Sequence, residues 1–416
     1  MKKHILLLFL SSQGLLAQQA TNELLMEFKN SYQFNKMDSL NEATKSENYY
    51  FYKSVYENVT NHPDVSLKLL KKNKNKALEN SFEYIKLVND NASKTYDYKK
   101  ANETSLRLIN EFKDLYSVDE LNEEINNQRI WEVLKNTPKQ TLSSFKKEVI
   151  KTKVDLAGLQ TIEVKNNDFK SDFVFDTGAG LSCITTSNAQ KLGVKILPDN
   201  NIEVQSFTGQ KNKVRIGVAN SLSIGAITIK NVVFLVYPDD AFTFAEGKYI
   251  INGIIGFPVA KDLGTLTFEN DSITVTKGSI NHNYPKNFFI DHLRPIVMVK
   301  YKGKIVPNNF DSGATWSLFS KTFYETFNEY IDANSTIEIT KHAGAGAEMK
   351  EDEIKILKNQ TLYIGTTKIV LSDLKIDHLN YGVFGKSNYG NIGQDVLKQF
   401  KKTTMSFDQN YLLLEN

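Results

Sequence analysis

The chain has 416 residues with 51 basic and 48 acidic side chains, a net charge of +3. This near balance does not indicate a nucleic-acid-binding protein, which would carry a marked basic excess. The lone cysteine, Cys183, leaves no disulfide within the chain, and its most economical interpretation is a buried core thiol.

The N-terminus has the pattern of a secretory signal peptide. A positive start, Met1-Lys-Lys-His, is followed by the apolar run Ile5–Leu10 and by a polar stretch that ends at Ala17. This pattern predicts a signal peptide over residues 1–17 and a secreted or periplasmic protein. The apolar run is too short to span a bilayer, and no later segment has the roughly 20 apolar residues that a membrane helix needs, so we expect no membrane span.

Residues 18–145 are rich in Lys, Asn, Glu, Leu and Tyr at helical spacing, which predicts an α-helical region. Two helix pairs are expected over 49–74 and 81–115, with breaks near Asn61-His-Pro63 and Asn89-Asp-Asn-Ala92. The arrangement faintly resembles a tetratricopeptide-like array without its signature residues.

Two roles remain open for this helical region. It is either a domain that binds a protein partner or a propeptide that covers a cleft. A released propeptide would leave a mature protein starting near Lys151. A linker is expected at Thr137-Pro-Lys-Gln140, and from Val154 onward the sequence reads as strand.

The remainder of the chain contains one motif written twice. Phe173-Val-Phe-Asp176-Thr-Gly-Ala-Gly180 and Asn309-Phe-Asp311-Ser-Gly-Ala-Thr315 each place an aspartate after apolar residues and before a hydroxyl residue and a glycine. Even the tripeptide Asp-(Ser/Thr)-Gly is expected by chance only ~0.2 times in a chain of this length. The two aspartates are 135 positions apart (311 − 176).

Other landmarks repeat at nearly the same offset. Gly253-Ile-Ile-Gly256 is matched by Asn391-Ile-Gly393, the turn glycine after Ile224 by the one after Ile364, and Thr-Phe-Glu269 by Ser-Phe-Asp408. A repeat on this scale indicates two copies of one β-rich unit. We therefore expect two lobes, over residues 150–280 and 281–416.

An apolar run, Asp-(Ser/Thr)-Gly-Ala, a hairpin and then apolar-apolar-Gly resembles the aspartic peptidases of the retropepsin and pepsin type. The resemblance implies a mainly β bilobal fold, with two pseudo-twofold-related β-barrel lobes behind the N-terminal α-helical domain. It implies that Asp176 and Asp311 are the catalytic pair, and it matches Ile255-Gly256 and Ile392-Gly393 to the segments that cross behind the catalytic loops. The residues that would support the pair are Thr177, Gly178, Ser312 and Gly313. The alanines Ala179 and Ala314 are closer to the retropepsin pattern, and with both half-sites in one chain a monomer is sufficient.

Elementary chemistry leads to the same assignment. A glycine directly after an aspartate allows a sharp turn that brings backbone amides up to a carboxylate. Two carboxylates held together cannot both ionise easily, so they share one proton, and one acts as base while the other acts as acid. The pair would activate a water to hydrolyse a peptide bond, with no metal or cofactor. Alanine replaces the serine that is often found after each glycine, which removes a hydroxyl donor near each carboxylate. The ionised form is then less favoured and the pKa values of the pair should lie higher, so we expect activity in mildly acidic to neutral buffer.

Each lobe also contains a hairpin with glycine at its tip, and the resemblance makes these hairpins flaps over a bound peptide. In the first, Ile202 and Val204 alternate toward the tip, and in the second Ile337 and Ile339 do so. The candidate substrate-binding residues at the tips are Phe207, Thr208, Gly209, Gly344, Ala345 and Gly346.

Two alternatives to an endopeptidase are kept. The first is a catalytically silent retropepsin-like protein that binds peptides. The second is a helical interaction module for a protein partner, with the β lobes as its scaffold. No metal site or dinucleotide cofactor is expected, because the six histidines form no HExxH-type cluster and the Gly-Ala-Gly segments lack the third glycine of a dinucleotide fingerprint.

Overall fold

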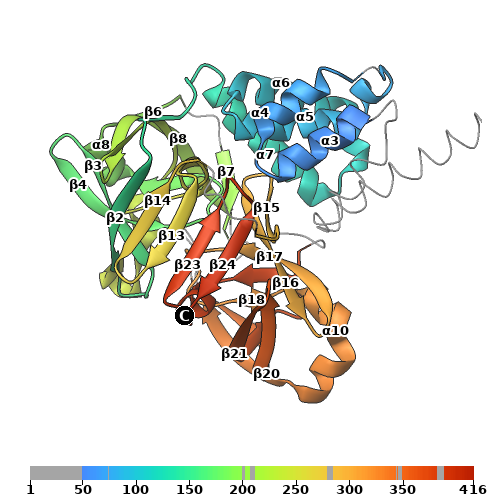
Figure 1. The fold of residues 1–416 in the computed structure, drawn as a ribbon. Helices are drawn as coiled ribbons and strands as arrows, with labels where there is room; N and C mark the ends of the chain where they lie inside the picture. Colours follow the sequence, from blue (N-terminus) through green and yellow to red (C-terminus); the bar gives the residue numbers. More distant parts are fainter. Residues whose placement is uncertain are drawn as a thin grey trace, which may run out of the picture.

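The structure is a computed structural model in which helices come first along the chain and strands follow (Figure 1). It describes residues 49–73, 75–198, 202–206, 211–278, 284–342, 344, 349–381 and 388–416. The predicted signal peptide over residues 1–17 lies outside the described residues. Among the helices that are described, none combines the length and apolar character needed to span a bilayer.

The N-terminal region is α-helical. Its helices are α3 (Tyr49–Val59), α4 (Pro63–Leu70), α5 (Phe82–Lys94), α6 (Tyr98–Glu111) and α7 (Val118–Leu134), with short 3-10 turns η1 (Leu78–Asn80) and η2 (Lys113–Leu115). The predicted break at Asn61-His-Pro63 is confirmed, because Asn61 has a φ of 62° and Pro63 begins α4. Proline suits that first helical position, where no backbone N–H bond is needed.

The second predicted break is wrong. Asn89-Asp-Asn-Ala92 lies inside α5, and the chain turns instead at Tyr96, with a φ of 59°, before Asp97 caps α6. The asparagines do not break the helix because their side chains bond to neighbouring helices: Asn89 donates to the Ala101 carbonyl at 2.9 Å and Asn91 donates to Ser66 Oγ at 2.8 Å. Tertiary contacts therefore override the local preference of asparagine for turns.

Lobe 1 contains a closed barrel of six strands. In neighbour order these are β3 (Gln160–Asn166), β4 (Phe169–Phe175), β12 (Gly253–Ile255), β5 (Ser182–Thr185), β9 (Ile227–Tyr237) and β8 (Lys211–Ile224), and pairing between β8 and β3 closes the ring. The predicted turn glycine, Gly225, joins β8 to β9 with a φ of 56°. Its positive φ explains why glycine occupies this tight turn.

Lobe 2 repeats this barrel strand for strand. The order is β16 (Arg294–Tyr301), β17 (Lys304–Phe310), β22 (Gly390–Ile392), β18 (Leu318–Phe319), β21 (Thr367–Ile376) and β20 (Lys350–Ile364), closed by β20 with β16. Gly365, with a φ of 58°, occupies the turn that Gly225 occupies in lobe 1. The predicted fold class is confirmed: two related β-barrel lobes follow an N-terminal helical region.

A shared sheet joins the two lobes. Strands β23 (Lys402–Ser406) and β24 (Tyr411–Glu415) of the second copy lie beside β13 (Thr265–Glu269), β14 (Ser272–Thr276) and β2 (Lys147–Val154) of the first (Figure 1). Strand β13 pairs antiparallel with β23, and Thr265 and Ser406 face each other with their hydroxyl oxygens 2.9 Å apart. The repeated Thr-Phe-Glu269 and Ser-Phe-Asp408 landmarks belong to this junction.

Shorter elements complete the lobes. The strands are β1 (Thr141–Leu142), β6 (Val194–Ile196), β7 (Ile202–Gln205), β10 (Thr243–Phe244), β11 (Tyr249–Ile250), β15 (Phe288–Asp291) and β19 (Thr336–His342). The helices are α8 (Thr186–Leu192), η3 (Asp239–Phe242), η4 (Ala245–Gly247), α9 (Phe257–Asp262), α10 (Lys321–Asn334) and α11 (Gln394–Leu397). The predicted linker at 137–140 falls between α7 and β1, and β2 begins before Val154, at Lys147.

The helical region packs against both lobes through buried apolar side chains. Phe51 and Val55 of α3 share one cluster with Phe289 and Met298 of lobe 2. A second cluster joins the helical region to lobe 1 and includes Trp131, Leu134, Cys183, Ile202 and Leu235. Because this apolar surface is buried, its exposure to water would cost free energy.

Buried polar groups reinforce the same contact. Asp262 of α9 accepts from Tyr96 Oη at 2.7 Å and from Gln140 Nε2 at 2.9 Å. Lys94, fully buried, pairs with Asp90 at 3.0 Å and donates to the Ile290 carbonyl of lobe 2 at 3.4 Å. A buried ammonium is tolerated only when it is paired and hydrogen-bonded, so this contact depends on groups from both sides.

Candidate active site

The two predicted catalytic loops occupy equivalent places at the ends of two strands. Asp176 follows β4 and Asp311 follows β17, and the backbone N–H of each donates to the carbonyl of Ile255 or Ile392 at 2.9 Å. Strands β12 and β22 therefore run parallel to β4 and β17 directly behind the loops. The segments Ile255-Gly256 and Ile392-Gly393 thus have a defined role in holding each aspartate.

The two loops meet closely enough that only glycine fits between them. A Cβ placed on Gly178 would lie 2.4 Å from Cγ of Asp311, and one on Gly313 would lie 2.2 Å from Cγ of Asp176. Each glycine therefore lies against the carboxyl group of the opposite lobe. The structure brings Asp176, Gly178, Asp311 and Gly313 together, as their place in the repeated motif predicts.

The hydroxyl residues link the loops across the pseudo-twofold axis. Thr177 Oγ1 donates to the Phe310 carbonyl at 2.9 Å and accepts from the Ser312 N–H at 3.1 Å. Ser312 Oγ donates to the Phe175 carbonyl at 2.7 Å and accepts from the Thr177 N–H at 3.0 Å. Both residues are fully buried, so these four bonds satisfy polar groups that water cannot reach.

The two carboxylates have different hydrogen-bond partners. Asp176 Oδ1 accepts from the N–H groups of Gly178 at 2.7 Å and Ala179 at 3.1 Å. Asp311 Oδ1 accepts from the Gly313 N–H at 2.8 Å, and its Oδ2 accepts from the side-chain amide of Asn391 at 2.9 Å. Each Oδ1 therefore accepts from the N–H of the glycine that follows it, whereas the second donor is the Ala179 backbone N–H for Asp176 and the Asn391 side-chain amide for Asp311.

Burial and the neighbouring carboxylate raise the pKa of Asp176 well above its ordinary value. Loss of water around the side chain is the largest cause, followed by the negative charge of Asp311 and a hydrogen bond between the two carboxyl groups. Both effects favour the protonated form of an acid. A pair that carries one proton at neutral pH is the state that general acid–base catalysis needs.

Cys183 lies on β5, close behind the first loop, and is buried as predicted. Burial and the charge of Asp176 raise the pKa of its thiol. A neutral, buried thiol is a poor nucleophile, so the geometry leaves the chemistry to the carboxyl groups.

The arms of the two predicted flaps are present. In the first, β7 pairs with β8, with Ile202 opposite Val214; in the second, β19 pairs with β20, with Ile339 opposite Glu353. At the tips, Gly344 is described, whereas Phe207, Thr208, Gly209, Ala345 and Gly346 lie outside the described residues.

Sequence reasoning missed two residues of the site, Asn391 and its partner Asn309. Asn309 Nδ2 donates to Asn391 Oδ1 at 2.7 Å, which orients the amide toward Asp311. Lobe 1 has Val174 and Ile254 at the equivalent places in β4 and β12. A residue-by-residue alignment of the two repeats would have revealed this difference, because it replaces two apolar residues by two polar ones.

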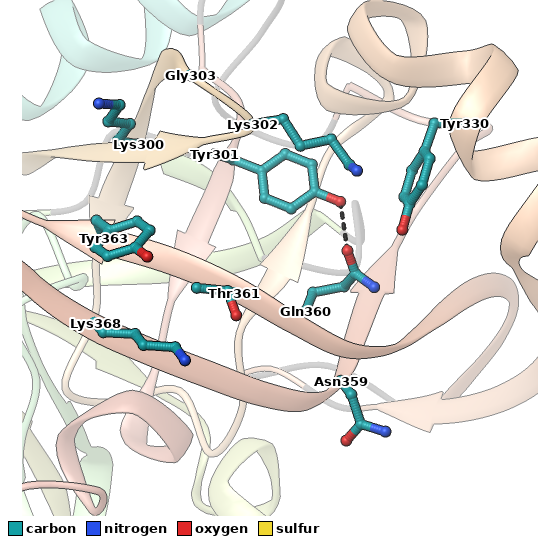
Figure 2. A pocket seen from close by; sticks show the side chains of 10 residues that line it. All are labelled: Lys300, Tyr301, Lys302, Gly303, Tyr330, Asn359, Gln360, Thr361, Tyr363 and Lys368. Atoms are coloured by element: carbon teal, nitrogen blue, oxygen red, sulfur yellow. Dashed lines mark hydrogen bonds between the residues drawn. The ribbon is translucent and has the colours of Figure 1, made fainter.

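Lobe 2 also contains a hollow of about 470 Å³, which is lined by residues of β16 and the turn after it, α10, β20 and β21 (Figure 2). Tyr301 Oη donates to Gln360 Oε1 there at 2.7 Å, and Lys302 Nζ lies 3.3 Å from the centre of the Tyr330 ring. The lining residues include no member of either catalytic loop. This hollow is therefore distinct from the candidate active site.

Comparison with known proteins gives one family match, in lobe 1, and remote similarity to solved structures. Residues 161–259 match the family model described as aspartyl protease. A solved structure of a retropepsin-like aspartic protease from Rickettsia conorii is 20% identical, with a TM-score of 0.22, and covers 33% of this chain and 91% of its own. Basic 7S globulin from soybean is 9% identical, with a TM-score of 0.40, and covers 65% of this chain and 95% of its own. No curated protein sequence matches the chain.

The family match includes β4, the first catalytic loop, the first flap hairpin and β12, which are the parts of lobe 1 that build its half of the site. Lobe 2 repeats the same barrel and loop. The chain therefore has the two β-barrel lobes that the resemblance implied, and the aspartyl protease family match lies within the first of them.

Proposed function

We propose that this chain is an aspartic endopeptidase that hydrolyses peptide bonds with a water activated by Asp176 and Asp311. The observation that carries the proposal is that each carboxyl group lies against the glycine of the opposite loop, 2.2 to 2.4 Å from the place where a Cβ would be. A turn with a purely structural role would not place a carboxyl group where the Cβ of this residue would be, and so would not require glycine there. The two carboxyl groups are also hydrogen-bonded to each other. The approach creates a pair of acids that share a proton.

The proposed reaction needs only groups present in the dyad. The ionised carboxylate takes a proton from water as the water oxygen attacks the carbonyl carbon, and the protonated carboxyl donates its proton to the carbonyl oxygen. The product of this step is a tetrahedral diol, which then collapses with protonation of the leaving nitrogen. Neither step forms a covalent bond to the protein.

The substrate would be a peptide or an unfolded protein segment, placed between the dyad and the two hairpins. The predicted signal peptide supports a secreted or periplasmic location. One chain would be sufficient for a complete site, because each lobe supplies one aspartate.

We also propose that the helical region stays attached to the lobes rather than acting as a removable propeptide. Its apolar residues share buried clusters with both lobes. A chain starting near Lys151 would lack half of β2, in which Lys151 itself pairs with Ser272. A role of this region in binding a protein partner is compatible with permanent attachment.

The decisive experiment compares cleavage of an unfolded protein mixture by the chain starting at residue 18 and by its Asp176→Asn and Asp311→Asn variants, from about pH 3 to 8. New peptide ends are read by mass spectrometry. Asp168→Asn, an exposed turn residue of the same lobe, is the matched control. We expect cleavage by the wild type and the control alone.

Three outcomes would change the proposal or one of its expectations. Equal cleavage by all four proteins would mean that a contaminating enzyme or another site is responsible. No cleavage by the wild type, combined with saturable peptide binding, would favour the catalytically silent peptide-binding protein. An activity maximum confined below about pH 4 would contradict the expected effect of Ala179 and Ala314 on the dyad.

A further inference from the structure

The two half-sites differ at one buried pair of positions behind the dyad. In lobe 2, Asn391 of β22 lies opposite Asn309 of β17; in lobe 1 the equivalent pair is Ile254 of β12 and Val174 of β4. All four side chains are buried, with exposed fractions of 0 to 5%. The difference is therefore one of chemistry within a conserved backbone geometry.

A buried asparagine pair costs free energy unless its polar groups find partners. Here the partners form a chain that ends on the dyad: Asn309 Nδ2 donates to Asn391 Oδ1 at 2.7 Å, and Asn391 Nδ2 donates to Asp311 Oδ2 at 2.9 Å. Asn309 Oδ1 has no hydrogen-bond partner among the described residues. Isoleucine and valine fill the same places in lobe 1 without that cost, so packing alone does not explain the asparagines.

Resting on the proposed function, we propose that Asn391 assigns the roles within the dyad, so that Asp311 is the ionised base and Asp176 is the protonated acid. An amide N–H donates a hydrogen bond to an ionised carboxylate and stabilises it. It cannot stabilise a carboxyl O–H in the same way, because that group is itself a hydrogen-bond donor. Asp176 has apolar residues at the corresponding place, and the N–H groups of Gly178 and Ala179 both donate to its Oδ1. Of the two aspartates, only Asp311 therefore accepts an N–H bond from the described residues on each of its two oxygens, and Oδ2 of Asp176 is left to carry the proton. The shared proton is therefore held on Asp176.

Other titratable groups near the dyad do not reverse this assignment. On the lobe 1 side, Cys183 interacts with Asp176, and Tyr237 is hydrogen-bonded to Cys183; burial raises the pKa of both groups, so both stay neutral. On the lobe 2 side, the carboxylate of Asp395 in α11 is held by Ser317, with Oγ to Oδ1 at 2.7 Å. Burial and the charge and hydrogen bond of Asp311 also raise the pKa of Asp176, in agreement with the geometry.

The assignment fixes the direction of the first chemical step. Asp311 accepts the proton of the attacking water, the water oxygen bonds to the carbonyl carbon, and the carbonyl oxygen takes the proton of Asp176. Asn391 touches neither substrate nor water in this scheme and acts as a positioning residue through Asp311.

The first test measures the protonation of each carboxyl group directly, by ¹³C NMR titration of Asp-labelled full-length chain, with Asp176→Asn and Asp311→Asn used for assignment. Near pH 6 we expect the Asp176 carboxyl to be protonated and the Asp311 carboxyl to be ionised. The opposite order would overturn the inference. Because this readout does not need cleavage, it remains valid even if the proposed peptidase activity fails.

The second test removes the donor with Asn391→Leu, which is similar in size. The low-pH limb of kcat/KM, set by ionisation of the base, should move up by about one to two pH units, the amount expected for a hydrogen bond to a charged group. Asn309→Leu, which removes only the orienting bond, should give a smaller shift in the same direction. Ile254→Leu at the equivalent place in lobe 1 should leave the limb unmoved.

A purely structural role for Asn391 predicts a different pattern, in which activity or melting temperature falls at every pH and the limb stays in place. That result would overturn the inference. If Asn391→Leu does not fold, Asn309→Leu and the carboxyl titration of the wild type still decide it.

Discussion

The glycines of the two aspartate loops lie directly against carboxyl groups. Gly178 and Gly313 have no space for even one added carbon, because the opposite Asp carboxyl already occupies it. Gly180, two residues after Gly178, has its nearest neighbour at 3.9 Å from the equivalent position. The motif therefore requires glycine because the opposite carboxyl group leaves no space for a Cβ, and it requires a hydroxyl residue because that side chain hydrogen-bonds to the opposite loop.

Gly313→Ala should reduce kcat/KM by at least about 100-fold, because a Cβ at 2.2 Å from Asp176 Cγ must displace one of the two carboxyl groups. Gly180→Ala is the matched control and should retain most activity. Steady-state kinetics on a peptide found by the mixture experiment would measure both. Similar losses in the two variants would show that loop flexibility, not carboxyl approach, is the reason for glycine.

The raised pKa of Asp176 has a consequence for stability. A carboxyl group whose pKa is higher in the folded than in the unfolded protein stabilises the fold fully below its ordinary value of 3.8, and this contribution is lost as pH rises through the folded-state pKa. Asp176→Asn removes the ionisable group. The variant should melt at a higher temperature than the wild type at pH 7, and the gain should disappear near pH 3.

Thermal melts of wild type, Asp176→Asn and the exposed control Asp168→Asn across this range would check the sign. A gain of equal size at pH 3 and pH 7 would show that it does not come from ionisation.

At the scale of elements, the two loops are held together by the hydrogen bonds of Thr177 and Ser312. Each hydroxyl donates to the strand-end carbonyl that precedes the opposite aspartate and accepts from the opposite backbone N–H. The arrangement ties β4 to β17 and so couples the positions of the two lobes at the site. Burial makes each bond expensive to lose.

Thr177→Val keeps the shape of the side chain and leaves the Phe310 carbonyl and the Ser312 N–H without their partner. We expect it to lower the free energy of unfolding by about 1 to 3 kcal/mol. Thr274→Val on β14, which alters no interlobe bond at the dyad, should change it by less than about 0.5 kcal/mol. Urea titration would measure both, and a Thr177→Val effect no larger than the control would contradict the proposed coupling of the loops.

The two hairpins predicted to be flaps differ in the residues that support them, although their arms are equivalent. Ile202 of the first hairpin is buried in the cluster that includes Trp131 of α7, whereas Ile337 and Ile339 of the second are 55% and 68% exposed. The helical region therefore supports the base of one flap. The supported hairpin belongs to lobe 1, the lobe in which the apolar pair Val174 and Ile254 lies behind the aspartate.

At the scale of the whole molecule, three parts form one packed unit. The shared sheet joins the lobes through β13 and β23, and the helical region contacts lobe 1 and lobe 2 through separate apolar clusters (Figure 1). Asp262 and Lys94 lie at the centre of the polar contacts. Removal of the helices would expose the lobe side of both clusters to water and would take away Lys94 and Tyr96, which bond to Ile290 and Asp262 of the lobes.

Trp131→Ala tests whether the helices are integral to the lobes. Trp131 is 6% exposed and stacks on Tyr98 with ring centres 5.9 Å apart, so the substitution should cost about 3 to 5 kcal/mol and lower the unfolding midpoint of the whole chain. Val118→Ala on the same helix, where the side chain is 77% exposed, is the control. Loss of helix signal while the lobes keep their unfolding midpoint would instead favour a detachable propeptide.

Much of the fold was predictable because it is written twice. The repeated aspartate loops, turn glycines and apolar-apolar-Gly segments each define a local backbone geometry, and the offset between them indicates two equivalent lobes. The helix break at Asn89–Ala92 was predicted wrongly because those asparagines are satisfied by other helices, and only tertiary contacts supply such partners.

The sequence by itself determined the two half-sites, since in each one the aspartate proposed to be catalytic, its glycine and its hydroxyl residue lie within a few residues of one another and local turn chemistry dictates their shape. Only the tertiary structure decided which atoms face each carboxylate, because Asn391 lies 80 positions from Asp311 and reaches it through pairing of β22 with β17. It also decided that the helical region shares its core with both lobes. Contacts of that kind depend on the packing of distant segments, which no local pattern specifies.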